Sequence, residues 1–305
     1  MIPSGGYIWW YVDAISEDGR NALTVIAFIG SVFSPYYAMA RRGGDADPHN
    51  HVTVNAILYT PRGKYWAMTE RGRASLERSR SHVAIGPSQY SWTGDRLVID
   101  IDEKTMPIPR RINGRITVDP GPVFSRTWNL DAAGRHEWRP IAPCAKVDVQ
   151  FERPSLNWKG HAYVDTNAGT ESLEAGFRSW TWSRQDRRGT TRIHYDVIQR
   201  NGVPRGLALD YNADGTVVPF EPAPIQDLPL TGWRVSRHTR AHPSNPARVL
   251  KGLEDTPFYS RSVLGFDGEG KEFKSVHESV DLDRFRSPIV QMMLPFKMPR
   301  WTRRR

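Results

Sequence analysis

Cysteine is almost absent from the sequence: Cys144 is the single one among 305 residues. An internal disulfide needs two cysteines and a zinc site built only from cysteines needs several, so the sequence excludes both, and nothing in it requires an oxidising compartment.

Long hydrophobic runs are missing as well. The most apolar stretch, residues 22–32, contains Thr24 and Gly30 and is shorter than the roughly 20 residues of a membrane-spanning helix. The first residues show no basic segment followed by an apolar one, so we expect no signal peptide and a cytoplasmic location.

Positive charge exceeds negative charge, with 42 Lys and Arg against 33 Asp and Glu and a formal net charge of +9. Such an excess favours nucleic acid, anionic lipid or an anionic substrate as a partner. The sequence has no RNA-recognition motif, zinc-finger spacing or basic heptad region, so we expect no nucleic-acid partner. The basic residues 300–305 include one Trp and follow residues 292–299, which are apolar except for Lys297. This combination suits peripheral contact with an anionic membrane. A solvated, frayed chain end is the alternative. We expect removal of residues 298–305 to weaken membrane binding and to spare the fold.

Short strands dominate the predicted secondary structure. Roughly fifteen segments alternate between apolar and polar residues and are separated by Gly, Pro, Asn and Asp turns. This pattern predicts an all-β chain built from sandwiches or barrels, with too many strands for one small barrel. The alternation stops at residues 167–177 and then restarts, so we place one domain at residues 1–175 and another at residues 176–305. Helical character is limited to three short segments, residues 35–42, 170–177 and 280–286.

A candidate acid lies in the stretch of residues 157–169, which reads as a strand near the middle of the chain. Alternation along a strand places His161, Tyr163 and Asp165 on one face. If this face lines a pocket, Asp165 is a candidate acid and Tyr163 can orient it. Two alternatives stay open: Asp165 could begin a turn or cap a helix, and His161 could be a structural histidine.

A second polar pair with the same spacing, His136 and Trp138, lies upstream. We expect the two pairs to come together in the fold. The alternative is a turn after the preceding glycine, Gly134, with the Trp138 ring serving only to pack against its neighbours.

The remaining polar motifs indicate no metal or phosphate chemistry. His49 and His51 form an H-x-H pair that could bind a metal, but no third ligand stands at a recognisable spacing, so we expect no metal site. Asp100, Asp102 and Glu103 are interpreted as a solvated strand face. The sequence contains neither a dinucleotide fingerprint followed by a helix nor a G-x-S-x-G nucleophile motif.

Several longer segments resemble the carotenoid 1,2-hydratases, which are also called hydroxyneurosporene synthases. The similarity covers nearly the whole chain and is carried by four runs, residues 5–14, 28–37, 135–143 and 160–167. The resemblance implies two lipocalin-like β-barrels in tandem with a few short helices, and the first barrel carries the catalytic motifs. It also implies a hydratase without a cofactor that adds water to the terminal C1–C2 double bond of an acyclic carotenoid such as neurosporene or lycopene, giving a tertiary alcohol.

The same resemblance implies the catalytic residues. The family combines the His and Trp of an H-x-W segment with the Tyr and Asp of a Y-x-D segment, and both segments are intact here, as His136 and Trp138 and as Tyr163 and Asp165. An isolated alkene must be protonated before water attacks it, and a carboxylic acid in an apolar pocket stays protonated near neutral pH. We therefore expect these four residues to converge on one apolar cavity, with Asp165 as a buried acid of raised pKa, the two aromatic rings stabilising the cation and His136 taking the proton of the water.

Two other functions are alternatives to hydration. One is a non-catalytic, lipocalin-like carrier of an apolar ligand, and the other is a pericyclic cyclase on the same tandem-barrel fold. A carrier needs no acid in its pocket, so the intact set of His136, Trp138, Tyr163 and Asp165 favours hydration.

Overall fold

The computed structural model describes residues 1–44, 46–187, 189–268 and 271–302, and it is mostly β, as predicted. The chain divides into two compact units. Unit 1 contains Met1–Asn129, Arg135–Ser172 and the C-terminal segment from Met292, and unit 2 contains Leu130–Gly134 and Leu173–Gln291. The C-terminal segment thus belongs to unit 1 although it follows unit 2 in the sequence. The predicted division between residues 175 and 176 stays a prediction.

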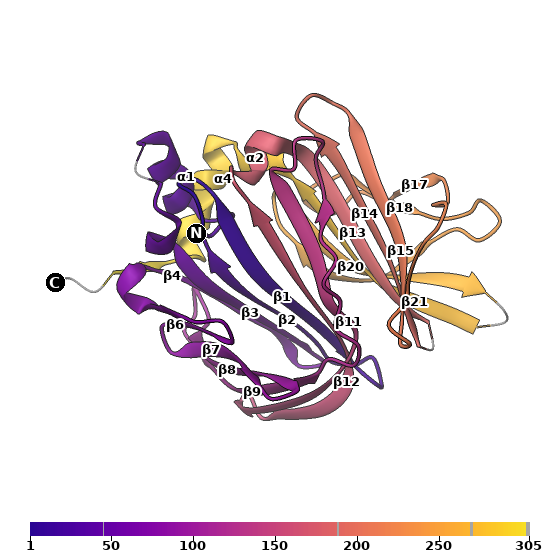
Figure 1. Cartoon of the computed structure of the whole chain (residues 1–305), viewed down its shortest axis with the longest axis horizontal. Helices are drawn as coiled ribbons and strands as arrows, with labels where there is room; N and C mark the ends of the chain where they lie inside the picture. The colour runs from indigo at the N-terminus through magenta and orange to yellow at the C-terminus, as the bar shows by residue number, and fades with distance from the viewer. Residues whose placement is uncertain (45, 188, 269–270, 303–305) are drawn as a thin grey trace. The chain divides into compact units, whose positions relative to one another are not determined.

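One large sheet forms most of unit 1 (Figure 1). Within the described residues it has 13 strands in the order β22-β4-β3-β2-β1-β12-β11-β9-β8-β7-β6-β5, and β10 pairs with β11 outside this path. All pairs are antiparallel except the one between β22 and β4. The strands are β1 (Tyr7–Ser16), β2 (Ala22–Ile29), β3 (Val52–Thr60), β4 (Gly63–Arg71), β5 (Leu76–Arg78), β6 (His82–Ile85), β7 (Ser88–Thr93), β8 (Arg96–Lys104), β9 (Arg111–Asp119), β10 (Trp128–Asn129), β11 (His136–Arg153), β12 (Leu156–Gly169) and β22 (Arg300–Trp301).

The sheet curls into a half-barrel, so that β4 lies against β8 and β3 against β6. Its inner face carries a single aliphatic core, to which β1, β2, β3, β8, β9, β11 and β12 all contribute. Strand β1 shows how the sequence separates the two faces. Val12 and Ala14 point into the aliphatic core, and the alternate residues Tyr7, Trp9 and Tyr11 point to the opposite face. The opposite face of β1 therefore carries a row of large aromatic side chains, which are also buried.

Strand β11 contains irregular pairing beside β12. The register with β12 shifts between Pro140 and Ala142 and again between Ala142 and Ala145. Before the shifts, His136 and Trp138 share the aromatic face, and after them Ala145 lies in the aliphatic core. A bulge of this kind re-aims side chains without ending the strand, so β11 continues for 18 residues through two prolines.

Unit 2 contains a seven-stranded sheet in the order β16-β15-β14-β13-β21-β20-β19 and a separate hairpin of β17 and β18, among the residues that the structure describes. Alternation in the sequence predicted most of these strands. They are β13 (Phe177–Arg187), β14 (Thr190–Gln199), β15 (Pro204–Asn212), β16 (Val217–Pro219), β17 (Ile225–Leu228), β18 (Arg237–Arg240), β19 (Arg248–Asp255), β20 (Tyr259–Gly268) and β21 (Lys271–Asp281).

Helices are short, as predicted. Ser34 caps α1, because its hydroxyl accepts hydrogen bonds from the backbone N–H groups of Tyr36 and Tyr37. The three predicted helical segments contain α1, α2 and α3, whereas α4 was not predicted. The helices are α1 (Pro35–Arg42), α2 (Leu173–Gly176), α3 (Leu282–Phe285) and α4 (Pro288–Met293), with 3₁₀ turns η1 (Pro48–Asn50), η2 (Arg73–Ser75) and η3 (Leu294–Phe296).

The acidic stretch of β8 divides between the two faces of the strand. Asp100 and Asp102 lie at the surface, where they accept hydrogen bonds from Arg115 and Arg111. The interpretation as a solvated face is wrong for Glu103, which is buried and accepts a hydrogen bond from Arg71 at 2.7 Å. Burial raises the pKa of Glu103, and the Arg71 charge opposes this effect.

Candidate active site

The two predicted polar pairs lie on neighbouring strands of unit 1. His136 and Trp138 begin β11, and Tyr163 and Asp165 lie in β12. All four side chains are buried. The interpretation of His136 and Trp138 as a turn is therefore wrong, and so is that of Asp165 as a cap or turn residue. His161 shares the strand but is exposed.

Two donors converge on one oxygen of Asp165. The indole N–H of Trp138 donates to Asp165 Oδ2 at 2.8 Å, and the Tyr163 hydroxyl donates to the same oxygen at 2.7 Å. The Trp138 contact joins β11 to β12, whereas the Tyr163 contact joins two residues of one strand face. The sequence predicts Tyr163 as the residue that orients Asp165 and gives Trp138 only an aromatic role. The structure adds an orienting hydrogen bond from Trp138.

Strand β1 completes the aromatic face beside Asp165. Tyr11 pairs in register with Asp165, and its ring meets the Tyr163 ring edge-on with centroids 6.1 Å apart. Tyr7 and Trp9 stack at 5.0 Å farther along the strand. The sequence places the aromatic residues of β1 in a run that resembles the hydratases but assigns none of them to the site. Their alternation, Tyr7, Trp9 and Tyr11, is the signal that could have assigned them to the site.

A second buried carboxylate lies on the same face. Asp13 is fully buried on β1 and pairs in register with Tyr163. It continues the alternation of Tyr11 and shares the face of Asp165, two residues along the neighbouring strand. Asp13 was not predicted as a site residue, because it belongs to neither of the two polar pairs in the sequence.

His136 has a different set of partners from Asp165. Its Nδ1 atom lies 2.8 Å from the hydroxyl of Tyr7, and its Nε2 atom lies 3.3 Å from Glu171 Oε1. Glu171 Oε2 accepts a hydrogen bond from Arg135 at 3.0 Å. Along β11, His136 pairs with Gly169 and Trp138 pairs with Asn167, so Trp138 is the nearer of the two to Asp165. Tyr7 and Glu171 were both missed in the sequence, because they lie 129 and 35 positions away from His136.

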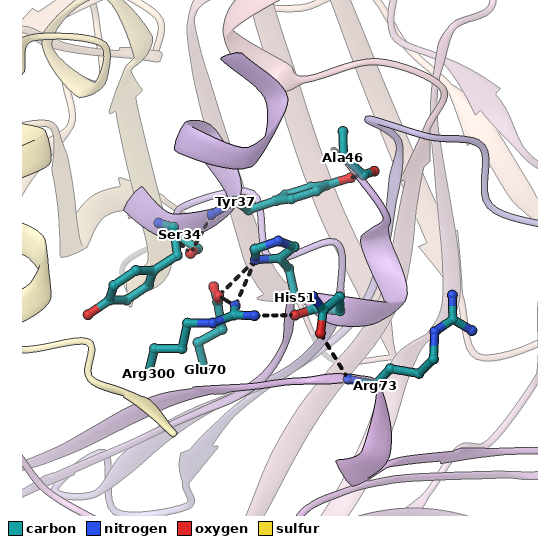
Figure 2. A network of polar contacts seen from close by, with 9 residues as sticks. Ser34, Tyr37, Ala46, His51, Glu70, Arg73 and Arg300 are labelled. Atoms are coloured by element: carbon teal, nitrogen blue, oxygen red, sulfur yellow. Dashed lines mark hydrogen bonds and ion pairs between the residues drawn. The ribbon is translucent and has the colours of Figure 1, made fainter. Parts of the chain in front are cut away.

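In the H-x-H pair, His51 belongs to a network of ion pairs (Figure 2). His51 Nδ1 lies 2.8 Å from the buried carboxylate of Glu70, and Arg300 contacts both groups. The side chain of His49 bonds instead to Asp47. In the described part of the chain no three His, Cys, Asp or Glu side chains are grouped as a metal site would require.

The C-terminal segment is held in place as far as Trp301. Met298 is buried, and Arg300 and Trp301 form β22 against the edge strand β4. Arg300 also donates to the backbone carbonyl of Asn50 at 2.9 Å. The alternative of a frayed end is wrong for these residues, and residues 303–305 lie outside the described part.

A pocket of about 870 Å³ lies in unit 2. Its walls include Phe220 and Phe273, each with an arginine over its ring, and His194. The four predicted site residues are not part of its lining. The expectation that those four residues line an apolar cavity stays a prediction.

Across the described ranges, no helix combines the length and the apolar character needed to cross a membrane.

Comparison with known proteins identifies relatives over almost the entire chain. The family model described as carotenoid hydratase CrtC matches residues 25–305. An acyclic carotenoid 1,2-hydratase of Thiocapsa roseopersicina is 51% identical over 300 residues, which are 98% of this chain and 74% of that protein. The enzyme of the same name from Rubrivivax gelatinosus is 47% identical over 302 residues, with the same coverage of both chains. One from Cereibacter sphaeroides is 39% identical and covers 90% of this chain and 98% of its own.

Solved structures with the same fold are distant in sequence. The crystal structure of an AttH protein from Nitrosomonas europaea has a TM-score of 0.63 at 13% identity and covers 90% of this chain and 92% of its own. The crystal structure of CghA with Sch210972 has a TM-score of 0.57 at 12% identity, over 91% of this chain and 88% of that one. These similarities establish the fold and nothing beyond it.

Proposed function

The chain belongs to the carotenoid hydratase CrtC family, and from this premise we propose that it is an acyclic carotenoid 1,2-hydratase in which Asp165 supplies the proton that starts the reaction. The observation that carries the assignment of the acid is the pair of donors, Trp138 and Tyr163, on one oxygen of the buried Asp165. The substrate is an acyclic carotenoid such as neurosporene or lycopene, and the product is a tertiary alcohol.

The reaction begins with proton transfer from Asp165 to C2 of the terminal double bond. Asp165 Oδ2 accepts two hydrogen bonds, so the proton of the acid is carried by Oδ1. Burial disfavours the carboxylate before substrate protonation, because a buried charge loses its hydration. Once the proton has left, both hydrogen bonds stabilise the carboxylate. The proposal therefore requires Asp165 to be protonated before the reaction, and the two donors support its conjugate base afterwards.

Protonation at C2 leaves a positive charge on the tertiary carbon C1. Aromatic faces attract such a charge, and each contributes about 0.5–2 kcal/mol depending on desolvation. Trp138 and Tyr163 both donate to Asp165, and the Tyr11 ring contacts the Tyr163 ring, so we expect the cation to form beside aromatic groups. Water then attacks C1 and loses a proton to the base, for which His136 is the family's candidate. Proton and water are the only reactants besides the polyene, so the proposal requires no cofactor.

The experiment that tests this function is product analysis after incubation of the purified protein with lycopene. We expect a product heavier by one water, carrying a tertiary hydroxyl. The Asp165→Asn variant keeps the shape of the side chain and removes the transferable proton, so alcohol formation should fall to background. The matched control is Asp148→Asn, which changes a carboxylate of β11 that pairs at the surface with Lys159. It should hydrate lycopene at the rate of the unmodified protein.

The other outcomes assign the protein differently. Unchanged lycopene, retained on the protein, would indicate a carrier, and a cyclised isomer of lycopene would indicate a pericyclic cyclase. An active Asp165→Asn variant would move the acid to another group, of which Asp13 is the buried carboxylate on the same face.

We further propose that the two units correspond to the two lipocalin-like barrels that the family resemblance implies. The chain passes from the first barrel to the second near residues 175 and 176, and the segment from Met292 returns to unit 1. The curled sheet of unit 1, with its aliphatic inner face, supports this for the first barrel. The seven-stranded sheet of unit 2 is the counterpart for the second barrel.

Peripheral contact with an anionic membrane, from the cytoplasmic side, is the remaining part of the proposal. The support is a group of exposed residues in the C-terminal segment of unit 1. The Phe296 side chain is 76% exposed and Trp301 is 51% exposed, and the exposed Lys297 lies between them in sequence. Apolar and aromatic side chains beside a cation suit the interface of an anionic bilayer, where an apolar polyene would be available.

A further inference from the structure

Both ring nitrogens of His136 are engaged by protein side chains. Tyr7 Oη lies 2.8 Å from Nδ1 in a buried contact, and Glu171 Oε1 lies 3.3 Å from Nε2. Glu171 is itself held by Arg135, which donates to its other oxygen at 3.0 Å. A carboxylate only accepts hydrogen bonds, so Glu171 holds the proton of the imidazole on Nε2. Nδ1 is then the acceptor, and the Tyr7 hydroxyl donates to it.

We propose that Tyr7 is the group that contacts the reacting water and that His136 takes the proton through Tyr7, with Glu171 as the positioning residue. This inference rests on the hydratase function proposed above. In the site so arranged, His136 reaches the water through the phenol, because Nε2 faces Glu171 and Nδ1 faces Tyr7. Tyr7 is therefore a catalytic residue of the water-addition step, and His136 acts behind it.

The oxygen of water forms a bond to the C1 cation, and one proton of the resulting oxonium passes to Tyr7 Oη while the proton of Tyr7 passes to His136 Nδ1. The imidazolium is stabilised by the Glu171 carboxylate. After the alcohol leaves, Nδ1 passes its proton back through Tyr7 Oη to water, which restores the imidazole with its proton on Nε2. Asp165, which gave its proton to C2, regains one from solvent. The sum is one alkene and one water converted into one alcohol.

Gly169 makes the contact between Tyr7 and His136 possible. It pairs in register with Tyr7 on β1 and with His136 on β11, so it lies between them in the sheet. A Cβ atom at Gly169 would come within 2.4 Å of Tyr7 Cε1 and 2.8 Å of Tyr7 Oη. The phenol ring therefore lies directly over this glycine and reaches across β12 to the imidazole. An alanine at this position would displace the ring from His136.

A hydrogen bond that serves only stability makes a different prediction. Loss of the Tyr7 hydroxyl would then lower the free energy of unfolding. Alkene protonation and water addition would be affected equally, so the ratio of alcohol formed to deuterium incorporated would stay unchanged. In the relay, loss of this hydroxyl blocks water addition but spares alkene protonation. The cation can still return its proton to Asp165, so in D₂O the recovered lycopene would acquire deuterium.

The experiment measures two quantities in D₂O, the formation of the alcohol and the deuterium content of the recovered lycopene. We expect Tyr7→Phe to lower alcohol formation by about 10²–10⁴-fold, the usual contribution of a general base, and to retain deuterium incorporation. Gly169→Ala should give the same pattern. Asp165→Asn should lose both signals, so failure of the proposed acid and failure of the relay are distinguishable. The matched control is Tyr90→Phe, which removes a buried hydroxyl from the aliphatic core and should leave both signals unchanged.

Glu171→Gln provides a test that does not depend on folding of the Tyr7 variant, because this side chain is partly exposed. It removes the charge that stabilises the imidazolium, so the acid limb of the pH–rate profile should move to lower pH and the maximal rate should fall. Glu171→Asp should recover part of the loss. Three outcomes would each overturn the proposal. Folded Tyr7→Phe could hydrate lycopene at the rate of the unmodified protein, or it could lose alcohol formation and deuterium incorporation in parallel. The third outcome is an unchanged pH–rate profile in Glu171→Gln.

Discussion

Glu70 and Arg300 form an ion pair although 230 positions separate them in the sequence. The Glu70 carboxylate is fully buried on β4, and Arg300 reaches it from β22, the parallel edge strand of the same sheet. His51 contacts both groups, as Figure 2 shows. The C-terminal segment is therefore joined to unit 1 by a buried charge as well as by strand pairing.

Removal of the Arg300 guanidinium should destabilise unit 1. Arg300→Met leaves the Glu70 carboxylate buried without its cation, and breaking one partner of a buried pair costs about 3–5 kcal/mol. Because the Arg300 side chain is 18% exposed, we expect a loss near the lower end, measured as the free energy of unfolding in urea. The matched control is Arg73→Met, whose partner Asp47 lies at the surface, and it should change that free energy by less than about 1 kcal/mol. Equal effects of the two substitutions would contradict the prediction.

The same relationship changes what truncation of the chain is expected to do. Removal of residues 298–305 would delete the buried Met298 and the cation of Glu70 together. The expectation that this truncation spares the fold therefore conflicts with the packing of the segment. Membrane binding is better tested by substitutions that keep Arg300 in place.

We expect Phe296→Ser and Trp301→Ser together to weaken sedimentation with vesicles of anionic phospholipid at low salt. Both side chains are exposed, so their loss should leave the unfolding transition unchanged. The control is Val218→Ser, which removes an exposed apolar side chain from β16 of unit 2. If the double variant and the control sediment equally with the vesicles, the C-terminal segment is not the contact with the membrane.

Acidification should destabilise unit 2 below about pH 6.5. Burial lowers the pKa of His194 and of His277 from 6.5 to about 4, because a buried imidazolium loses its hydration. Between these pH values the unfolded chain binds more protons than the folded one, so stability falls as the pH decreases from 6.5 towards 4. The contribution is roughly 3 kcal/mol for each histidine and is fully present above pH 6.5. Urea unfolding of the protein and of His277→Gln, followed by Trp fluorescence from pH 7.5 to 4.5, should show a weaker pH dependence in the variant.

Strand positions were largely predictable from the sequence, because alternation reports which residues share a face. The stretch of residues 157–169 is a strand in the structure, and Tyr163 and Asp165 lie on one face as predicted. Strand β11 was recognised only in part, from residue 145 onward. Its earlier half contains two prolines and two register shifts, which break the alternation that a single sequence displays.

Contacts between strands were not predictable in the same way. Alternation gives the face of a residue but not the register of its strand, and register decides that Tyr11 pairs with Asp165 and that Tyr7 reaches His136. The hydrogen bond from Trp138 to Asp165 also depends on the register of β11. The sequence could therefore identify acid, aromatic and imidazole groups, but it could not say which of them touch.

The two donors on Asp165 Oδ2 predict a graded loss of activity. Tyr163→Phe removes one hydrogen bond and keeps the ring, so the carboxylate formed in the transition state loses about 1.5–3 kcal/mol of stabilisation. This corresponds to a decrease in kcat of about 10–100-fold with little change in KM, because the interaction strengthens only as charge develops. Tyr163→Ala also removes the aromatic face and should decrease kcat further. Trp138→Phe should resemble Tyr163→Phe, because the indole N–H donates to the same oxygen. Steady-state kinetics with lycopene separates the two parameters, and a variant that raises KM at unchanged kcat would show that the hydroxyl of Tyr163 binds substrate and does not assist the acid.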